Sequence, residues 1–249
     1  MNQVQMQMPT LSKTNKILMI TTGVLFLLES LLSRGAGFSL TSILGLSAKG
    51  LGDGLVFQLV TYPLVEKQLL AVIFNGLLLW FLGSELETQW GRKRYLQFIG
   101  AATLTAGIVY VLIGLTFLSH TAVSSFPLSG LQGIGAALCV AYGILYPDRT
   151  FMFMMIFPMK AKWFCALLVG MELYTGFFSP MGALAWGHLA AMAGGFGMLI
   201  WFTKAGSKKG NKSSSFSFKM EKKKGKAHLS LVEDEKKEDD KNHPPKYWH

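Results

Sequence analysis

Four strongly polar side chains lie inside long apolar runs of this 249-residue chain. Polar groups are costly in hydrocarbon, so those that remain usually face the interior of a helix bundle, where they bond to one another or serve a function. A histidine can exchange a proton, and a carboxamide can both donate and accept hydrogen bonds. The four candidates are Asn75, Gln132, Glu172 and His188.

Three further carboxylates, Glu29, Glu85 and Glu87, lie near the ends of apolar runs. We expect Glu85 and Glu87 to cap the helix that ends there and to pair with the basic cluster 92–94. For Glu172, two interpretations are open. It bonds a neighbouring helix or water in a cavity, or it faces the interface near the end of its helix.

The composition indicates that these side chains lie in a membrane protein. Hydrophobic residues make up 51% of the chain and charged residues 15%, against about 25% charged in soluble proteins. The first 203 residues contain 11 Lys/Arg and 7 Asp/Glu, too few to cover a soluble surface. The net charge of +10 is concentrated in the tail and comes with no nucleic-acid-binding motif, so no nucleic-acid partner is expected.

The two cysteines, Cys139 and Cys165, lie within apolar runs and lack the spacing of metal ligands. They are expected to be small buried hydrophobic residues. Neither a metal ion nor another cofactor is expected.

Six apolar runs predict an all-α integral membrane domain over residues 17–203, preceded by a short N-terminal segment, residues 1–16. The Gly-rich stretch 33–65 is too broken to span and is expected to be a loop lying partly in the interface. Six spans place both termini on one side, and the bias of Lys and Arg predicts that this side is cytoplasmic. The predicted spans are approximately 17–32, 68–82, 96–118, 128–146, 163–178 (with a possible earlier start at Phe151) and 183–202.

Residues 204–249 form a basic and then acidic tail that is predicted to be disordered, because it has little apolar surface to bury. Its Lys-rich half follows a predicted span directly. Anionic lipid would attract such a segment by about 1 kcal/mol per Lys. The alternative is that the tail only fixes topology and solubility.

Small residues recur every fourth position in the fourth and sixth spans and predict close helix packing. If the two ladders face each other, Gln132 and His188 both lie beside the contact, and Gln132 is then expected to bond His188. Alternatively, each ladder packs on a different helix. The ladders are Ser129, Gly133, Ala137 and Ala141 in one span and Ala183, Gly187, Ala191 and Gly195 in the other.

Five segments carry motifs in the order of the predicted spans. They are 74–87 (Phe-Asn, then Leu-Leu-Trp-Phe-Leu-Gly-Ser-Glu-Leu-Glu), 91–95 (Gly-Arg-Lys-Arg-Tyr), 130–133 (Gly-Leu-Gln-Gly), 157–163 (Phe-Pro-Met-Lys-Ala-Lys-Trp) and 187–195 (Gly-His-Leu-Ala-Ala-Met-Ala-Gly-Gly). Together they resemble the rhomboid family of intramembrane serine proteases. The resemblance covers about residues 40–203 and implies a six-transmembrane-helix rhomboid-like bundle.

The resemblance implies roles for four positions, two of which are substituted. His188 corresponds to the general base of the family and Asn75 to a residue that binds the oxyanion. Gln132 stands at the nucleophilic serine of the Gly-x-Ser-Gly motif, and a carboxamide cannot form an acyl-enzyme. Ala71 stands at a second oxyanion-binding position that is commonly histidine. The Trp-Arg pair of the first loop corresponds to Phe57–Gln58, so its Arg is also absent.

These departures favour a pseudoprotease that binds transmembrane segments of client proteins. The alternative is an active intramembrane serine endopeptidase with an unconventional nucleophile, Ser129 or, less favourably placed, Cys139. A transporter is disfavoured, because few polar residues lie in the spans and no internal repeat is evident. The compact body resembles bacterial members of the family, so the expected location is a plasma membrane, specifically a bacterial inner membrane.

Overall fold

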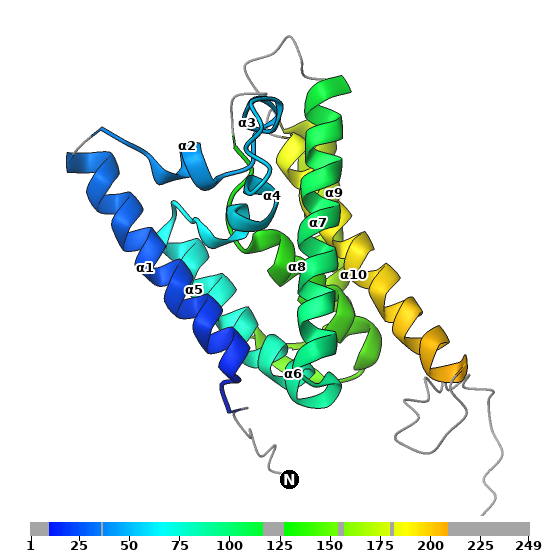
Figure 1. Ribbon diagram of the computed structural model, residues 1–249. Helices are drawn as coiled ribbons and strands as arrows, with labels where there is room; N and C mark the ends of the chain where they lie inside the picture. Colours follow the sequence, from blue (N-terminus) through cyan, green and yellow to red (C-terminus); the bar gives the residue numbers. More distant parts are fainter. Residues whose placement is uncertain (1–9, 36, 117–126, 154–156, 180–181, 209–249) are drawn as a thin grey trace, which may run out of the picture. The chain divides into compact units, whose positions relative to one another are not determined.

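A computed structural model describes residues 10–35, 37–116, 127–153, 157–179 and 182–208, and these residues are mostly helical (Figure 1). The longer helices are α1 Lys13–Gly35, α5 Leu69–Leu78, α6 Ser84–Trp90, α7 Arg92–Thr116, α8 Gln132–Leu145, α9 Ala161–Phe178 and α10 Gly182–Lys208. The short helices are α2 Leu40–Leu44, α3 Ala48–Gly52, α4 Gln58–Thr61 and the 3-10 turn η1 Tyr62–Leu64.

Four described helical stretches are long and apolar enough to cross a membrane, as judged by length and composition. They are Lys13–Gly35, Leu69–Trp90, Arg92–Thr116 and Gly182–Lys204. The prediction of a largely helical membrane protein is therefore confirmed. Helices α8 and α9 form where the fourth and fifth spans were predicted, but α8 is a shorter apolar helix and the count of six is not established.

Three predicted boundaries differ from the structure. The fifth span does not start at Phe151, because an antiparallel hairpin of β1 Thr150–Phe153 and β2 Phe157–Lys160 precedes α9. The stretch 33–65 is not an irregular loop, since it contains α2, α3, α4 and η1. Helix α10 continues to Lys208, past the predicted start of the tail, and the rest of the predicted tail and most of the predicted N-terminal segment lie outside the described residues.

Helix α8 is the most enclosed helix among the described residues, because every residue from Gly133 to Gly143 is buried. Its small residues lie against those of α10. A Cβ built on Gly133 would lie 3.3 Å from the Cβ of Ala191, and one built on Gly195 would lie 3.2 Å from the Cβ of Ala137. Gly187 instead faces Leu128 and Tyr110. The two ladders thus meet through part of their length, which is the close approach that small residues permit.

The second candidate span is not a uniform α-helix. Between α5 and α6 it contains a π-helical segment, η2 Leu79–Gly83. A π-helical turn inside an α-helix is rare and changes the phase of the side chains on its two sides. The residues of α5 and those of α6 therefore face different neighbours.

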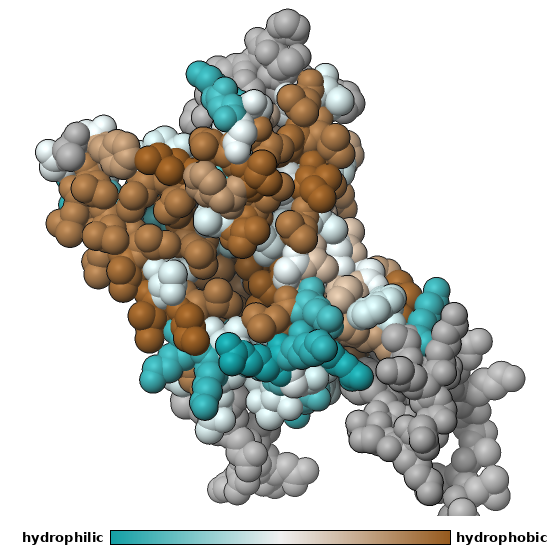
Figure 2. All heavy atoms as spheres, viewed as in Figure 1, coloured by the Kyte–Doolittle hydropathy of each residue, from teal (hydrophilic) through white to brown (hydrophobic). Residues whose placement is uncertain are grey.

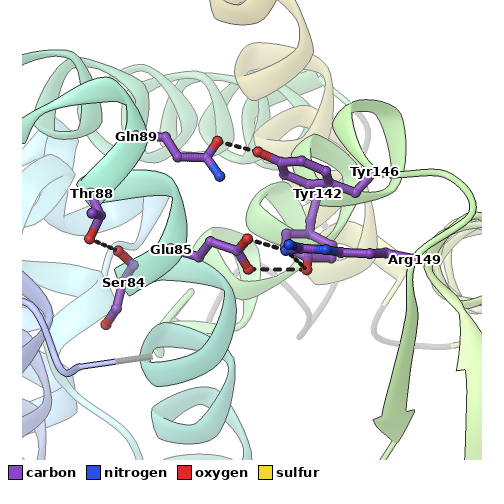
Figure 3. Close-up of polar contacts among 7 residues, drawn as sticks. All are labelled: Ser84, Glu85, Thr88, Gln89, Tyr142, Tyr146 and Arg149. Atoms are coloured by element: carbon purple, nitrogen blue, oxygen red, sulfur yellow. Dashed lines mark hydrogen bonds and ion pairs between the residues drawn. The ribbon is translucent and has the colours of Figure 1, made fainter. Parts of the chain in front are cut away.

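Polar contacts tie α6 to the end of α8 (Figure 3). Glu85 accepts hydrogen bonds from the Tyr142 hydroxyl (3.1 Å) and from Arg149, and Gln89 accepts one from Tyr146. The predicted pairing of Glu85 with the cluster 92–94 is therefore wrong. The reason is that the chain after α8 folds back and brings Arg149 against α6.

The partner of Glu87 also differs from the prediction. Its two carboxylate oxygens accept hydrogen bonds from the hydroxyls of Ser12 and Thr14, each at 2.5 Å. Nearby, the Tyr95 hydroxyl donates to Asn15 Oδ1 at 2.6 Å. These contacts hold the start of α1 against α6 and α7.

Hydrophobic side chains cover most of the visible face, and hydrophilic ones gather at the end where α6 meets α7 (Figure 2). Among the described residues, the exposed basic cluster 92–94 lies at this junction. This distribution is what a membrane-embedded body requires, since apolar side chains face lipid and charged ones stay in the polar interface.

Candidate functional site

A cavity of about 260 Å³ lies between α5, α8 and α9. Its lining is mostly apolar, with four residues that carry polar side chains. The lining residues are Gln68, Leu70, Ala71, Phe74, Asn75, Leu78, Gln132, Ala136, Leu168 and Glu172. Three of the residues singled out by the rhomboid resemblance, Ala71, Asn75 and Gln132, thus share one cavity.

Gln132 is the first residue of α8, and the segment before it is fixed by backbone contacts. Leu46 and Leu128 form an isolated antiparallel bridge, and the N–H of Gly130 donates to the carbonyl of Tyr62 at 3.0 Å. The Gln132 side chain is exposed, in contrast to the eleven residues that follow it. The carboxamide is therefore presented to the cavity at the start of a buried helix.

His188 of α10 is connected to Gln132 through Glu172 of α9. Glu172 Oε1 lies 3.1 Å from His188 Nδ1 and accepts a hydrogen bond from Gln132 Nε2 at 3.3 Å. The expected direct bond between Gln132 and His188 is thus replaced by a bond that each makes to the same carboxylate oxygen. Of the two interpretations of Glu172, the structure shows the first, because this side chain is buried and bonds neighbouring helices.

A carboxylate beside Nδ1 favours the tautomer that carries its proton on this nitrogen. The lone pair then remains on Nε2, which is the arrangement of a general base. In a serine hydrolase this nitrogen takes the proton of a hydroxyl nucleophile. Gln132 offers no such hydroxyl, so His188 is a base without a nucleophile at this position.

Glu66 is a second carboxylate near His188. It lies just before α5, is 9% exposed, and accepts a hydrogen bond from the N–H of Lys67 at 3.1 Å. Burial raises the pKa of the Glu66 carboxyl, whereas the N–H of Lys67 and the charge of His188 act in the opposite direction. His188 therefore bonds the carboxylate of α9 and interacts through charge with the carboxylate before α5.

Gly130 permits this approach of Glu66. Its φ is +93°, in the left-handed region that favours glycine, and a Cβ there would lie within 3.1 Å of the Glu66 Cδ. This glycine is the first residue of the motif that corresponds to Gly-x-Ser-Gly. Glycine at this position allows the turn before α8 and leaves space for the Glu66 carboxylate.

The other positions from the resemblance lie at distinct places. Asn75 is buried in α5, and a Cβ on Gly135 would lie 3.0 Å from its Oδ1. Ala71, one helical turn earlier, offers no hydrogen-bonding side chain. Gln58 is fully buried and donates to the carbonyl of Ile43 at 2.9 Å, so it holds the first loop together.

The two alternative nucleophiles are placed differently from Gln132. Ser129 is partly exposed and precedes α8, and it is not among the residues that line the cavity. Cys139 is a buried, free thiol in the middle of α8, and Cys165 is free and half-buried.

Among the described residues, no group of three or more His, Cys, Asp or Glu side chains could hold a metal ion.

Sequence reasoning missed Glu66 as a member of this site and did not connect Glu172 with Gln132. Glu66 directly precedes a predicted span, so its position was a usable signal for a carboxylate near the start of that helix. The bridge through Glu172 joins residues 40 and 16 positions apart and depends on how three helices pack. No local pattern carries that information.

Comparison with known proteins agrees with the rhomboid resemblance. "Rhomboid-like protein 19" of Arabidopsis thaliana is 29% identical over 126 residues, which cover 49% of this chain and 40% of that protein. The chain thus matches less than half of the length of this relative. The similarity supports a rhomboid-like chain and does not by itself carry an activity to it.

A second comparison corrects the expected location. Residues 16–220 match the family described as "Eukaryotic integral membrane protein (DUF1751)". A bacterial inner membrane is therefore the wrong assignment, because the family is eukaryotic and the relative comes from a plant. The error arose from reading a small body without extra helices as a bacterial trait. The match covers most of the sequence, and the chain belongs to this family of eukaryotic integral membrane proteins, as a rhomboid-like member.

Proposed function

We propose that this protein is a rhomboid-like pseudoprotease that binds transmembrane segments of client proteins without cleaving them. The observation that carries the proposal is the occupant of the nucleophile position. Gln132 is exposed at the cavity, its amide bonds Glu172, and no acyl-enzyme can form on a carboxamide. Within this proposal, α8 and α9 count as the fourth and fifth membrane helices of a six-helix bundle.

The cavity supports the binding half of the proposal. Its apolar lining comes mostly from α5, with Ala136 of the buried α8 and Leu168 of α9. The exposed side chains of α5 include Leu69, Leu70 and Ile73, which would contact a helix arriving from the lipid. An apolar helix with a small polar group matches a lining of this kind.

Site-specific photocrosslinking tests the proposal. A photoreactive residue at Leu70, which is exposed and lines the cavity, is expected to crosslink a synthetic single-span peptide in lipid vesicles. The control position is Ile108 on α7, which is also exposed but distant from this lining. Equal crosslinking from both positions would show that the peptide meets the protein only by random contact in lipid.

The alternative function, an active serine endopeptidase that uses Ser129, makes a different prediction. A serine-reactive fluorophosphonate would label the native chain, and Ser129→Ala would abolish the label. Under our proposal, the native chain stays unlabelled. Ser129 is not among the described residues that line the cavity, which favours our proposal over the alternative.

A further inference from the structure

The cavity holds a carboxylate oxygen that has no hydrogen-bond partner among the described residues. Glu172 is 9% exposed, and both of its hydrogen bonds are made by Oε1, to Gln132 Nε2 and His188 Nδ1. No hydrogen bond from the described part of the chain reaches Oε2. Among the described residues, Oε2 is not one of the fully buried side-chain atoms that lack a partner, so it keeps access to the cavity that Glu172 lines and can accept a further donor.

The charges around Glu172 are also unbalanced. Glu172 from α9 lies 3.1 Å from His188 Nδ1, and the charge of His188 also acts on Glu66 from the loop before α5. When both carboxylates are ionised they carry two negative charges, and His188 supplies at most one positive charge. In the described part of the chain, no Lys or Arg forms an ion pair with either carboxylate. The cluster therefore favours an additional positive charge.

The rest of the cavity is shaped for an apolar occupant. Leu70, Phe74, Leu78, Ala136 and Leu168 line it together with Glu172. At 1.5 Å per residue, His188 lies roughly 9 Å along the axis from the start of its candidate span, Gly182–Lys204, and so below the membrane surface. An occupant that reaches this depth must be largely hydrophobic and still provide a cation.

We propose that the cavity selects transmembrane helices that carry a Lys or Arg within the membrane, with Glu172 Oε2 as the acceptor of that side chain. This inference rests on the proposed function, client binding, and names the class of client. A cationic side chain is unfavourable in lipid, and a buried carboxylate that lacks a full set of partners compensates it. The same pairing satisfies the open oxygen of Glu172.

The test measures binding of two synthetic peptides to the full-length chain in phosphatidylcholine vesicles. Both peptides are fluorescent Leu/Ala transmembrane helices, and one has a single Lys near its middle where the other has Leu. We expect the Lys peptide to bind at least tenfold more tightly. Equal affinity of the two peptides would overturn this inference while leaving the proposed function intact, whereas binding of neither peptide would overturn both.

Variants of the chain assign the preference to Glu172. Glu172→Gln removes the charge at nearly constant shape and is expected to abolish the tenfold preference. The matched control, Asp53→Asn, removes a charge from an exposed loop position and is expected to keep it. If Glu172→Gln also retains the preference, the acceptor is not Glu172 and the inference is wrong.

A second variant keeps the inference testable should Glu172→Gln fail to fold. Gln132→Lys places a cation of the chain itself beside Glu172 from an exposed position. We expect it to lower the affinity for the Lys peptide to that of the Leu peptide, so that the preference disappears. An undiminished preference in this variant would overturn the inference.

Discussion

At the scale of single residues, Gly130 is the position with the strictest steric requirement near the cavity. Its φ of +93° disfavours any side chain, and a Cβ would meet the Glu66 carboxylate. We expect Gly130→Ala to destabilise the protein by about 1–3 kcal/mol. Thermal unfolding in detergent measures the loss. The control is Gly100→Ala in α7, where a Cβ meets no atom within 4 Å and the change should be neutral or slightly stabilising.

Glu66 gives a prediction about pH. Burial raises the pKa of its carboxyl above the ordinary value, so the folded state binds this proton more tightly than the unfolded state does. Proton binding by Glu66 therefore adds to the free energy of unfolding. This contribution is complete below the ordinary pKa of a glutamate and is lost as pH rises through the pKa of Glu66 in the folded state. Glu66→Gln should therefore raise the melting temperature at neutral pH by roughly 2–4 °C, for about 1 kcal/mol.

The same variant should show little difference from the native chain at acidic pH. There Glu66 is protonated in both states and resembles glutamine in charge. Melting curves recorded from acidic to neutral pH check this trend. A stabilisation by Glu66→Gln that is as large in acid as at neutral pH would contradict the assigned cause.

At the scale of elements, the polar anchor at the start of α1 is expected to matter more than the exposed contacts of α6. Helix α1 has many exposed apolar side chains, whereas Asn15 is fully buried and bonds the Tyr95 hydroxyl at 2.6 Å. We expect Asn15→Ala to cost about 1–3 kcal/mol, because it leaves a buried donor unpaired. Hydrogen exchange within α1 should increase in this variant.

Arg149→Ala is the variant to compare with Asn15→Ala, because it removes an exposed contact of α6. Arg149 pairs with Glu85, but its side chain is 55% exposed, and ion pairs of exposed side chains contribute about 0–1 kcal/mol. Its removal should leave exchange in α1 unchanged. An effect on α1 as large as that of Asn15→Ala would show that the Arg149–Glu85 contact and the anchor of α1 are coupled.

The predictable part of the fold is the part that local pattern determines. Apolar runs located the long helices, and the spacing of small residues anticipated the approach of Gly133 to Ala191. The hairpin before α9 was not predictable in this way, because a short apolar run around Pro158 does not distinguish a strand from the start of a helix. The partners of Glu85 and Glu87 come from distant segments, so neighbouring sequence suggested the wrong ones.

Only some members of the candidate site were predictable from the sequence. Motif resemblance identified Asn75, Gln132 and His188 as family positions, and Asn75 and Gln132 line one cavity. The connection through Glu172 and the presence of Glu66 depend on packing between helices. Sequence spacing within one helix contains no information about that packing.

At the scale of the whole molecule, the chain is a rhomboid-like membrane protein with a cavity lined by residues of α5, α8 and α9. His188 retains a carboxylate partner, which alone would suit a base. Gln132, which stands at the nucleophile position by resemblance, bonds the same carboxylate, and under our proposal this arrangement is a polar contact between helices.

The most direct test of this account is the mass of a peptide recovered with the protein. The full-length chain is incubated in vesicles with the Lys-containing transmembrane peptide and purified, and the bound peptide is analysed by mass spectrometry. The account predicts that the recovered peptide is uncleaved. Peptide fragments that accumulate with the native chain and disappear in His188→Ala would contradict it, as would the recovery of no peptide at all.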